Sequence, residues 1–262
     1  MDIPSLHRQF LADTLPRMRQ DPRIVGVAIG GSIAEGRPDR YSDVDLIVVV
    51  DDDAYDAVLR ERLALIGGWA PLVAGFTGEH VGEPRLIVTL VGPPLLHVDF
   101  KFVRLADFAE RTEDPAICWD RDGLLADALA QQPAVPSELD LQWVEDRFWV
   151  WVHYGATKLG RGELFETIGV LTHLRDLVLG PLAARRAGTH PRGVRRLETA
   201  APDAAHALRA TLSGYDRHEA GRALLAAADL YRQWSAGAPV ERRRDAEKLA
   251  VQYLREVVDD LG

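Results

Sequence analysis

The first half of the chain carries four short apolar runs separated by glycine, proline and charged clusters. Runs of this kind, rich in Val, Ile and Leu, are typical of β-strands; they are RIVGVAIG (23–30), VDLIVVV (44–50), RLIVTLVG (85–92) and LLHVDFKFV (95–103). Mixed polar and apolar spacing predicts helices over residues 5–19 and 54–66, the second beginning among acidic residues that suit a helix N-terminus. We therefore expect a sheet with flanking helices.

The pattern changes near residue 135. Pro133 and Pro136 interrupt helical spacing there, and beyond them Ala, Leu, Arg and Glu recur with helical periodicity to the end, apart from a connection over residues 185–203. The sequence therefore predicts a mixed α+β protein of two domains. Residues 1–135 would hold the sheet, and residues 136–262 would form a helical bundle.

Composition narrows the classes of protein that fit. The 262 residues are 47% hydrophobic, which is enough for a substantial core, and the formal net charge of −9 disfavours nucleic acid and anionic membranes as partners. A cationic small molecule suits this charge better. The single cysteine, Cys118, excludes an internal disulfide and is interpreted as a small buried hydrophobe. The sequence shows no long apolar run and no signal peptide, so we expect a cytoplasmic protein. We expect it to be a monomer or a homodimer.

The stretch GGSIAEGRPDRYSDVDLIVVV (30–50) carries the first candidate chemistry. Gly31 and Ser32 follow the first predicted strand, and their small size leaves amides and a hydroxyl available to phosphate oxygens. Asp43 and Asp45 stand two residues apart at the start of the next strand, so their carboxylates share one face. Like charges that close are costly unless a cation neutralises them.

Asp99 offers a third carboxylate on a later predicted strand. It interrupts an alternating pattern, and its neighbours on the same strand face are His97 and Lys101. Mg²⁺ prefers oxygen ligands, and a phosphoryl-transfer site with two such ions needs several carboxylates to offset their charge. We therefore predict that Asp99 joins Asp43 and Asp45 in a metal site.

The constellation resembles the nucleotidyltransferase superfamily that includes DNA polymerase β, with its Gly-Ser pair, a spacer, Asp-x-Asp, and a distant Asp on another strand. Within the superfamily, the chain length and the segments CWDRDGLL (118–125) and ATKLGRGELFET (156–167) look like those of antibiotic nucleotidyltransferases acting on aminoglycosides or lincosamides. The resemblance implies a polymerase β-like catalytic domain followed by a helical substrate-binding domain.

The resemblance also implies a mechanism. Asp43 and Asp45 would hold Mg²⁺ on the phosphates of ATP or another nucleoside triphosphate, while Gly31 and Ser32 contact the β- and γ-phosphates. A substrate hydroxyl would attack the α-phosphorus and pyrophosphate would leave. Asp99 would either complete the metal site or accept the hydroxyl proton, and the sequence leaves both roles open. Lys158 is the candidate for neutralising the triphosphate from the helical domain.

Other residues carry weaker predictions. Glu145 and Glu166 are helical carboxylates that could bind substrate amines, although exposed helix faces commonly carry such groups. His97 and Lys101 are more simply explained as polar residues on a wet strand face. The aromatic run over residues 143–154 is expected to pack against the first domain, with a minority of its side chains lining a substrate cleft.

Three functions are compatible with this pattern. The first is Mg²⁺-dependent transfer of a nucleoside monophosphate, AMP from ATP in the leading form, to a hydroxyl of a small and cationic antibiotic-like molecule. The second keeps the reaction but modifies a protein or an RNA, as in toxin–antitoxin systems; the acidic balance disfavours RNA. The third is a catalytically silent nucleotide-binding module, against which the three carboxylates count.

Overall fold

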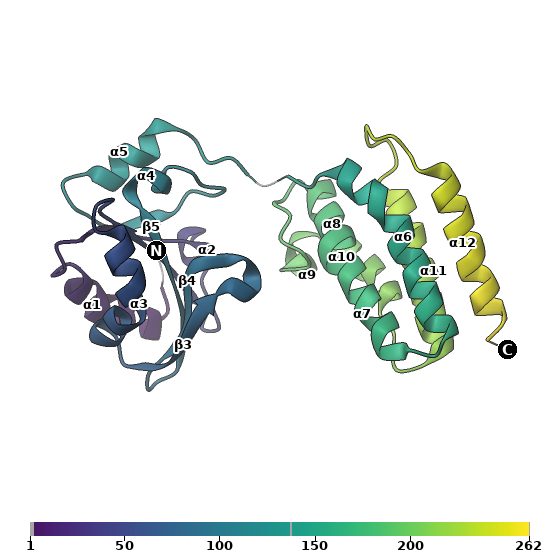
Figure 1. The fold of residues 1–262 in the computed structure, drawn as a ribbon, viewed down its shortest axis with the longest axis horizontal. Coiled ribbons are helices and arrows are strands. Elements are labelled where there is room, and N and C mark those ends of the chain that lie inside the picture. Colours follow the sequence, from purple (N-terminus) through teal and green to yellow (C-terminus); the bar gives the residue numbers. More distant parts are fainter. Residues whose placement is uncertain (1–2, 137, 262) are drawn as a thin grey trace. The chain divides into compact units, whose positions relative to one another are not determined.

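The computed structural model describes residues 3–136 and 138–261. The chain divides into two compact units, Met1–Pro136 and Ser137–Gly262, and the predicted domain boundary lies beside this division. The first unit holds the sheet and the second is built from helices (Figure 1). Among the described residues, no helix is both long enough and apolar enough to span a bilayer.

A six-stranded mixed sheet forms the centre of the first unit, with the strand order β3-β4-β5-β2-β1-β6. The strands are β1 (Ile24–Ile29), β2 (Val44–Val50), β3 (Leu72–Gly78), β4 (Glu83–Val91), β5 (Leu96–Arg104) and β6 (Ala116–Asp120). Strands β2 and β5 pair in parallel, and the other neighbours pair antiparallel. The four predicted strands are confirmed as β1, β2, β4 and β5, and the mixed α+β class is confirmed with them.

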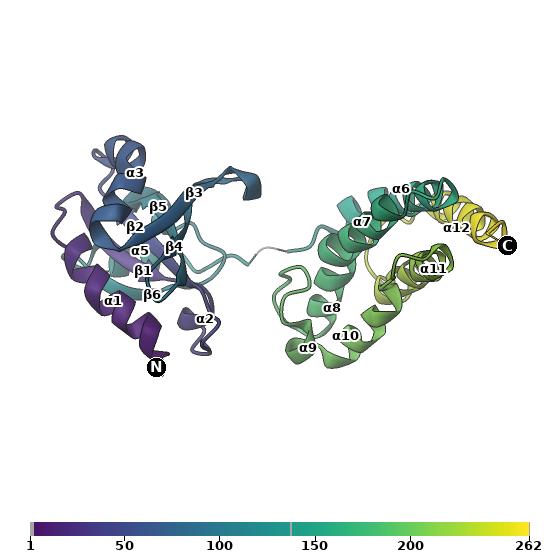
Figure 2. The ribbon, with the colours of Figure 1, turned by 90° about the horizontal axis from the view of Figure 1, so that it is seen from below.

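Helices cover both faces of this sheet. They are α1 (Ser5–Met18), α2 (Gly31–Ala34), α3 (Tyr55–Trp69), the short 3₁₀ turn η1 (Glu79–Val81), α4 (Leu105–Phe108) and α5 (Leu124–Gln131). Helices α1 and α3 lie side by side, and their apolar residues share one core with the face of β5 that carries Phe100 and Phe102 (Figures 1 and 2). A smaller core on the other face joins Val49 and Val103 to α4 and α5.

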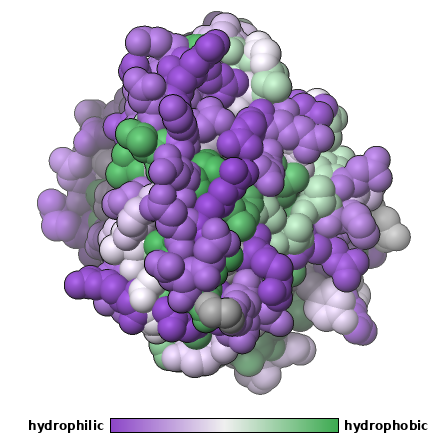
Figure 3. Space-filling view, turned by 90° about the vertical axis from the view of Figure 1, so that its right-hand side faces the viewer, coloured by the Kyte–Doolittle hydropathy of each residue, from purple (hydrophilic) through white to green (hydrophobic). Residues whose placement is uncertain are grey.

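The second unit is the predicted helical bundle. Its elements are α6 (Leu141–Gly160), α7 (Leu164–Leu174), the π-helical turn η2 (Arg175–Leu179), α8 (Gly180–Arg186), α9 (Leu197–Ala200), α10 (Pro202–Leu208), the 3₁₀ turn η3 (Arg209–Thr211), α11 (Arg217–Trp234) and α12 (Arg244–Asp259). The predicted connection over residues 185–203 contains one complete short helix, α9. Seen from the side of α12, the surface is mostly hydrophilic, with hydrophobic groups visible between charged ones (Figure 3).

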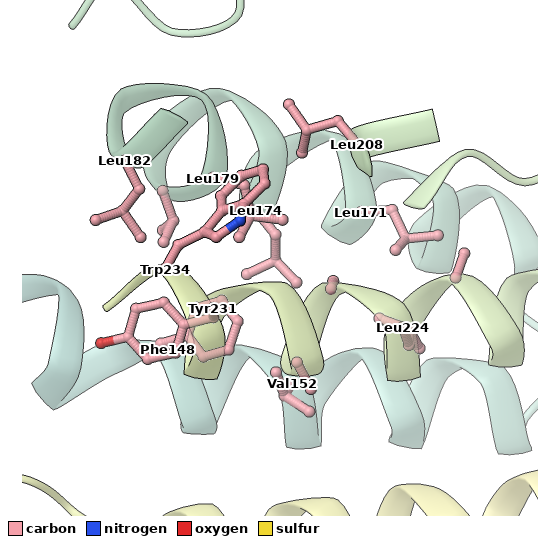
Figure 4. Packing of buried hydrophobic residues seen from close by; sticks show 14 of the residues in the cluster. Phe148, Val152, Leu171, Leu174, Leu179, Leu182, Leu208, Leu224, Tyr231 and Trp234 are labelled. Atoms are coloured by element: carbon pink, nitrogen blue, oxygen red, sulfur yellow. The ribbon is translucent and has the colours of Figure 1, made fainter. Parts of the chain in front are cut away.

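The core of the bundle corrects one prediction about the aromatic run. The sequence predicted that these aromatic side chains pack against the first domain. Phe148 and Trp149 are instead almost fully buried in the core of the helical unit. The ring of Phe148 stacks on that of Tyr231 from α11 with centroids 3.8 Å apart (Figure 4). Aromatic pairs of this kind add about 0.5–1.5 kcal/mol beyond the area they bury. Trp143 and Tyr154, in contrast, remain exposed.

Candidate active site

The sheet brings two of the three predicted carboxylates together. Strands β2 and β5 are parallel neighbours, and their register pairs Asp45 directly with Asp99. Paired residues on adjacent strands point to the same face at a strand spacing of about 4.8 Å. The two carboxylates are therefore next to one another even though 53 residues separate them in the chain.

The position of this pair on the sheet follows from alternation along β2. Val44, Leu46, Val48 and Val50 face the core beneath α1 and α3, whereas Ile47 and Val49 belong to the smaller core on the opposite face. Asp45 continues that second row one step beyond Ile47, toward the start of the strand. The small core thus ends where the acidic pair begins.

Asp43 lies immediately before β2, at the end of a loop that local hydrogen bonds order. The backbone amide of Tyr41 donates to the Asp39 carboxylate over 2.8 Å, and the Asp39 amide donates to the Ser42 hydroxyl over 2.9 Å. On α1, the buried His7 donates from Nε2 to the Ser42 carbonyl over 2.6 Å. These contacts hold the backbone next to Asp43.

A complete three-carboxylate cluster is not assembled. Across the described residues, no three His, Cys, Asp or Glu side chains are gathered closely enough to hold a metal ion. The register between β2 and β5 brings together only Asp45 and Asp99, the acidic pair, among the three predicted carboxylates. Asp43 lies just before the start of β2. The predicted metal-binding role of all three stays a prediction.

Gly31 lies directly against Asp45, one member of this pair. The amide of Gly30 donates to the Asp45 carbonyl over 2.8 Å, which fixes the turn from β1 into α2 on the side of β2. Gly31 has a φ of +57°, and a Cβ added there would lie 2.0 Å from Oδ2 of Asp45. Only glycine allows both this backbone conformation and this close approach.

Ser32 has a buried hydroxyl without a hydrogen-bond partner among the residues that the structure describes. Leaving a buried polar group unpaired costs about 1–3 kcal/mol, so such a group calls for an explanation. The first backbone N–H groups of a helix also lack partners within that helix, and α2 begins at Gly31. Hydrogen-bond donors are therefore concentrated at the turn that meets Asp45.

His97 and Lys101 share the strand face of Asp99 and differ in their contacts. Nε2 of His97 lies 3.0 Å from Oδ1 of Asp99, so this histidine touches the candidate site. Lys101 instead pairs with Glu83 at 2.9 Å. The hydrogen bond from Arg85, followed by that from Lys101, lowers the pKa of Glu83 to about 2.

Lys158, the predicted triphosphate ligand, lies near the end of α6 and is held within the helical unit. Its Nζ is 2.6 Å from Oε2 of Glu163 and 5.1 Å from the ring centre of Tyr154. The hydrogen bond to Glu163 raises the pKa of Lys158, so its ammonium stays charged. The ammonium thus has a carboxylate partner, and a role on phosphate stays a prediction.

Glu145 differs from the exposed, substrate-lining carboxylate expected from the sequence. It is 1% exposed and accepts hydrogen bonds from the Tyr231 hydroxyl at 2.7 Å, Nη1 of Arg242 at 2.8 Å and the Arg243 amide at 2.9 Å. Burial acts to raise the pKa of Glu145, but these hydrogen bonds outweigh it and lower the pKa. The carboxylate joins α6, α11 and the segment before α12.

Glu166 is exposed on α7, as expected for a residue that could meet a ligand. Its Oε2 accepts a hydrogen bond from the Tyr154 hydroxyl over 3.2 Å. It also lines a surface groove of the helical unit together with Trp151, Phe165 and His173. Glu166 therefore remains a candidate for binding a substrate amine.

Two contacts of the site were not predicted from the sequence. His7 holds the loop before Asp43 through Ser42, although residues 7 and 42 lie on separate elements and carry no joint motif. The contact between His97 and Asp99 could have been found, because alternate residues of a strand share a face. The sequence interpretation gave His97 only a structural role.

Comparison with known proteins supports the class of the first unit. Residues 11–80 match the family model described as a nucleotidyltransferase domain. The matched residues include Gly31, Ser32, Asp43 and Asp45 and end before Asp99. The match confirms the predicted superfamily and its enzyme class, nucleotidyltransferase, on the part of the chain that carries the Gly-Ser and Asp-x-Asp motifs. No curated protein matches the chain.

Solved structures that are similar to the chain include three with low sequence identity. An aminoglycoside 6-adenyltransferase from Bacillus subtilis is 13% identical, with 94% of this chain and 97% of that chain covered and a TM-score of 0.39. A nucleotidyltransferase-like protein from Exiguobacterium sibiricum is 16% identical, with 97% and 80% covered and a TM-score of 0.39.

The third is a spectinomycin adenyltransferase from Enterococcus faecialis, solved with ATP and spectinomycin. It is 11% identical, with 97% of this chain and 98% of that chain covered and a TM-score of 0.28.

Replacing Gly31 by Ala tests the close approach of α2 to the acidic pair. The added Cβ would meet the Asp45 carboxylate at 2.0 Å, so we expect Asp45 to be displaced and turnover to fall by at least about tenfold. Gly36→Ala is a matched control because Gly36 also has a positive φ, +73°, but open space around its Cβ. Both variants should lose about 1 kcal/mol of stability to backbone strain. Equal turnover in the two variants would contradict this geometry.

Proposed function

We propose that the chain is a Mg²⁺-dependent enzyme that transfers AMP from ATP to a hydroxyl of a small, amine-bearing molecule. Aminoglycosides and lincosamides are the acceptor classes that the sequence resemblance favours, which would make the protein an antibiotic-modifying enzyme. The sheet unit would carry the chemistry, as the catalytic domain, and the helical unit would bind the acceptor. The matched nucleotidyltransferase domain supports the reaction class.

The observation that carries the proposal is the close approach of the Gly31 turn to Asp45, which the sheet register pairs with Asp99. Gly31 lies in contact range of the Asp45 carboxylate, and the next residue, Ser32, has a buried hydroxyl without a hydrogen-bond partner among the described residues. A buried hydroxyl of this kind is commonly satisfied by an ordered water, an ion or a ligand. A metal-bound triphosphate has the oxygens and the cation that such a site needs.

The residues present fit a magnesium ion. Mg²⁺ keeps several waters and is usually bound by one or two carboxylates together with substrate phosphates, so the acidic pair is sufficient without a closed protein cage. Asp45 would hold the ion together with Asp43 at the entry to β2, and with Asp99 if that residue is a metal ligand rather than the base. When bound, Mg²⁺ neutralises charge on the phosphates and orients them.

The remaining chemistry belongs to the chain's own groups. Ser32 and the Gly31 amide would donate hydrogen bonds to the β- and γ-phosphates and hold them in place. The acceptor oxygen attacks the α-phosphorus in line, the bond from that phosphorus to the bridging oxygen breaks, and pyrophosphate leaves. Asp99 would accept the hydroxyl proton if it acts as the base, with His97 holding its other oxygen.

Asp99→Asn should separate the two roles left open for this residue. As a general base, Asp99 would support turnover alone, so kcat would fall by about 10²–10⁴-fold while the affinity for Mg-nucleotide stays unchanged. As a metal ligand, Asp99 would support both turnover and Mg-nucleotide binding, so the affinity would fall together with kcat. Calorimetric titration with Mg²⁺ and a nonhydrolysable ATP analogue, beside steady-state kinetics, gives both quantities. Unchanged turnover would remove Asp99 from the site.

The identity of the acceptor requires a direct screen. Purified protein is incubated with Mg²⁺, ATP labelled on the α-phosphate, and in turn an aminoglycoside panel, a lincosamide, a mixture of soluble proteins and total RNA. We expect label on a small molecule and an equal amount of pyrophosphate. Label on protein or RNA instead would establish the alternative acceptor classes, and absence of any transfer would favour a silent nucleotide-binding module.

A further inference from the structure

The helical unit has an aromatic groove between α6 and α7, which pack against each other. Its volume is about 340 Å³, and its lining residues are Trp151, Tyr154, Phe165, Glu166, Gly169, Val170 and His173. The residues from α6 are three apart, and Glu166, Gly169, Val170 and His173 follow helical spacing on α7, so each helix presents one face. A volume this small suits one ring or one ammonium group, at the lower end of ligand pockets.

The groove combines exposed aromatic rings with one carboxylate. Phe165 is 80% exposed and Tyr154 is 45% exposed, which is unusual for aromatic residues of a folded bundle. Glu166 is held against this wall by the hydroxyl of Tyr154. The ring of Tyr154 already has a cation near it, because Nζ of Lys158 lies 5.1 Å from its centre. Aromatic faces and a carboxylate together attract organic cations.

Gly169 provides an independent sign that the groove is kept open. It lies inside α7, where glycine is less favourable than alanine by about 1 kcal/mol. Packing does not require it, because an added Cβ would meet no heavy atom within 4 Å among the described residues. A helix that retains glycine at an open position on a groove leaves space that a side chain would otherwise fill.

We propose that this groove binds the ammonium-bearing ring of the acceptor through cation–π contacts and an ion pair with Glu166. The inference rests on the proposed function, since it assigns a subsite and a charge to the acceptor of that reaction. The occupant is an organic cation: a protonated amino sugar, an aminocyclitol ring or a substituted ammonium group. A neutral ring of the same shape would gain the apolar contacts but lose both electrostatic contributions.

Binding can be measured on the full chain without nucleotide, so that it does not depend on turnover. The probes are choline, its neutral isostere 3,3-dimethylbutan-1-ol, and 2-deoxystreptamine, each followed by ligand-observed NMR and by quenching of tryptophan fluorescence. We expect both cations to bind at least fivefold more tightly than the neutral alcohol and to weaken as ionic strength rises. Equal binding of choline and the alcohol would overturn the proposal.

Two pairs of variants locate the binding site. Gly169→Leu should fill the groove and reduce cation binding by at least tenfold, while Gly67→Leu, an open helical glycine of α3 in the other unit, should not. Glu166→Gln should weaken the binding of choline several-fold and leave the binding of the neutral alcohol unchanged. Glu198→Gln on α9 should change the affinity for neither probe. The midpoint temperature of thermal unfolding of Gly169→Leu should be no lower than that of the wild type, because leucine is more favourable in a helix than glycine.

The outcomes also separate this inference from the proposed function. Transfer of α-label to an aminoglycoside by Gly169→Leu at the wild-type rate and KM would show that the acceptor does not use the groove, although the enzyme class would stand. Groove-dependent binding of both cations without transfer to any acceptor would leave the ligand class intact and overturn the proposed reaction. An increased KM in Gly169→Leu with kcat preserved is the result expected from both together.

Discussion

Replacing Asp45 by Asn should abolish nucleotidyl transfer and leave the fold intact. The substitution keeps the shape of a side chain that lies beside Gly31 and opposite Asp99, but it removes one of the two negative charges of the acidic pair. Since the pair would hold Mg²⁺ on the transferring phosphate, we expect kcat to fall by about 10²–10³-fold or more. Pyrophosphate release from ATP in the presence of an acceptor measures the loss, and circular dichroism checks the fold.

Asp43→Asn extends the same test to the residue that the structure places before β2. We expect a comparable loss if Asp43 is a metal ligand, and a smaller one if Asp45 and Asp99 suffice. Asp53→Asn is the matched control, because Asp53 is an exposed aspartate just after the same strand. Near-normal turnover by Asp45→Asn would defeat the assignment of the acidic pair, whatever the result at Asp43.

The second large effect concerns stability. Glu145→Gln should destabilise the helical unit by about 3–5 kcal/mol, because Gln has one accepting oxygen in place of two. It cannot accept from Arg242 and Tyr231 while still accepting from the Arg243 amide and Trp149, and the arginine loses its carboxylate. Denaturant unfolding followed by tryptophan fluorescence reports on this directly, since Nε1 of Trp149 donates to Glu145 at 3.3 Å. Asp146→Asn is the control one residue along α6, where an exposed pair with Arg243 should matter little.

The loss at Glu145 should depend on pH in a defined direction. The pKa of Glu145 is lower in the folded protein than in the unfolded chain, so its contribution is present above the ordinary carboxyl pKa of about 4.3. As the pH falls below that value toward the folded-state pKa, the contribution disappears. The difference in unfolding free energy between wild type and Glu145→Gln should therefore narrow below about pH 4. A difference that does not change with pH would contradict the account.

The elements that sequence reasoning found are those with a strong periodic or apolar signal. Strand β2 is apolar apart from Asp45, β5 alternates apolar with polar residues, and the helices of the second unit follow a clear helical spacing. The edge strands β3 and β6 were missed because an edge strand needs no apolar run: β3 contains two glycines and is largely exposed, and β6 is short. These segments become strands because they pair with a neighbouring strand, and the local sequence pattern alone does not predict such pairing.

The same division holds for the candidate site. Gly31, Ser32 and Asp45 stand out in the sequence because their residue types and spacing suit phosphate and metal binding, and their roles stay predictions. Strand alternation places Asp99 on one face with His97 and Lys101. The direct pairing of Asp45 with Asp99 depends on the register between two distant strands, which one sequence does not give. The burial of Glu145 was not predicted because its partners, Tyr231 and Arg242, lie far along the chain.

The most direct test of the reaction follows the two ends of the triphosphate. Wild-type protein is given Mg²⁺ and an aminoglycoside or lincosamide acceptor, with ATP labelled on the α-phosphate in one reaction and on the γ-phosphate in the other. Nucleotidyl transfer predicts that the product carries the α-label without the γ-label, and that the γ-label leaves as pyrophosphate. A product carrying the γ-label, or release of orthophosphate with no labelled product, would contradict the assignment of this site to nucleotidyl transfer.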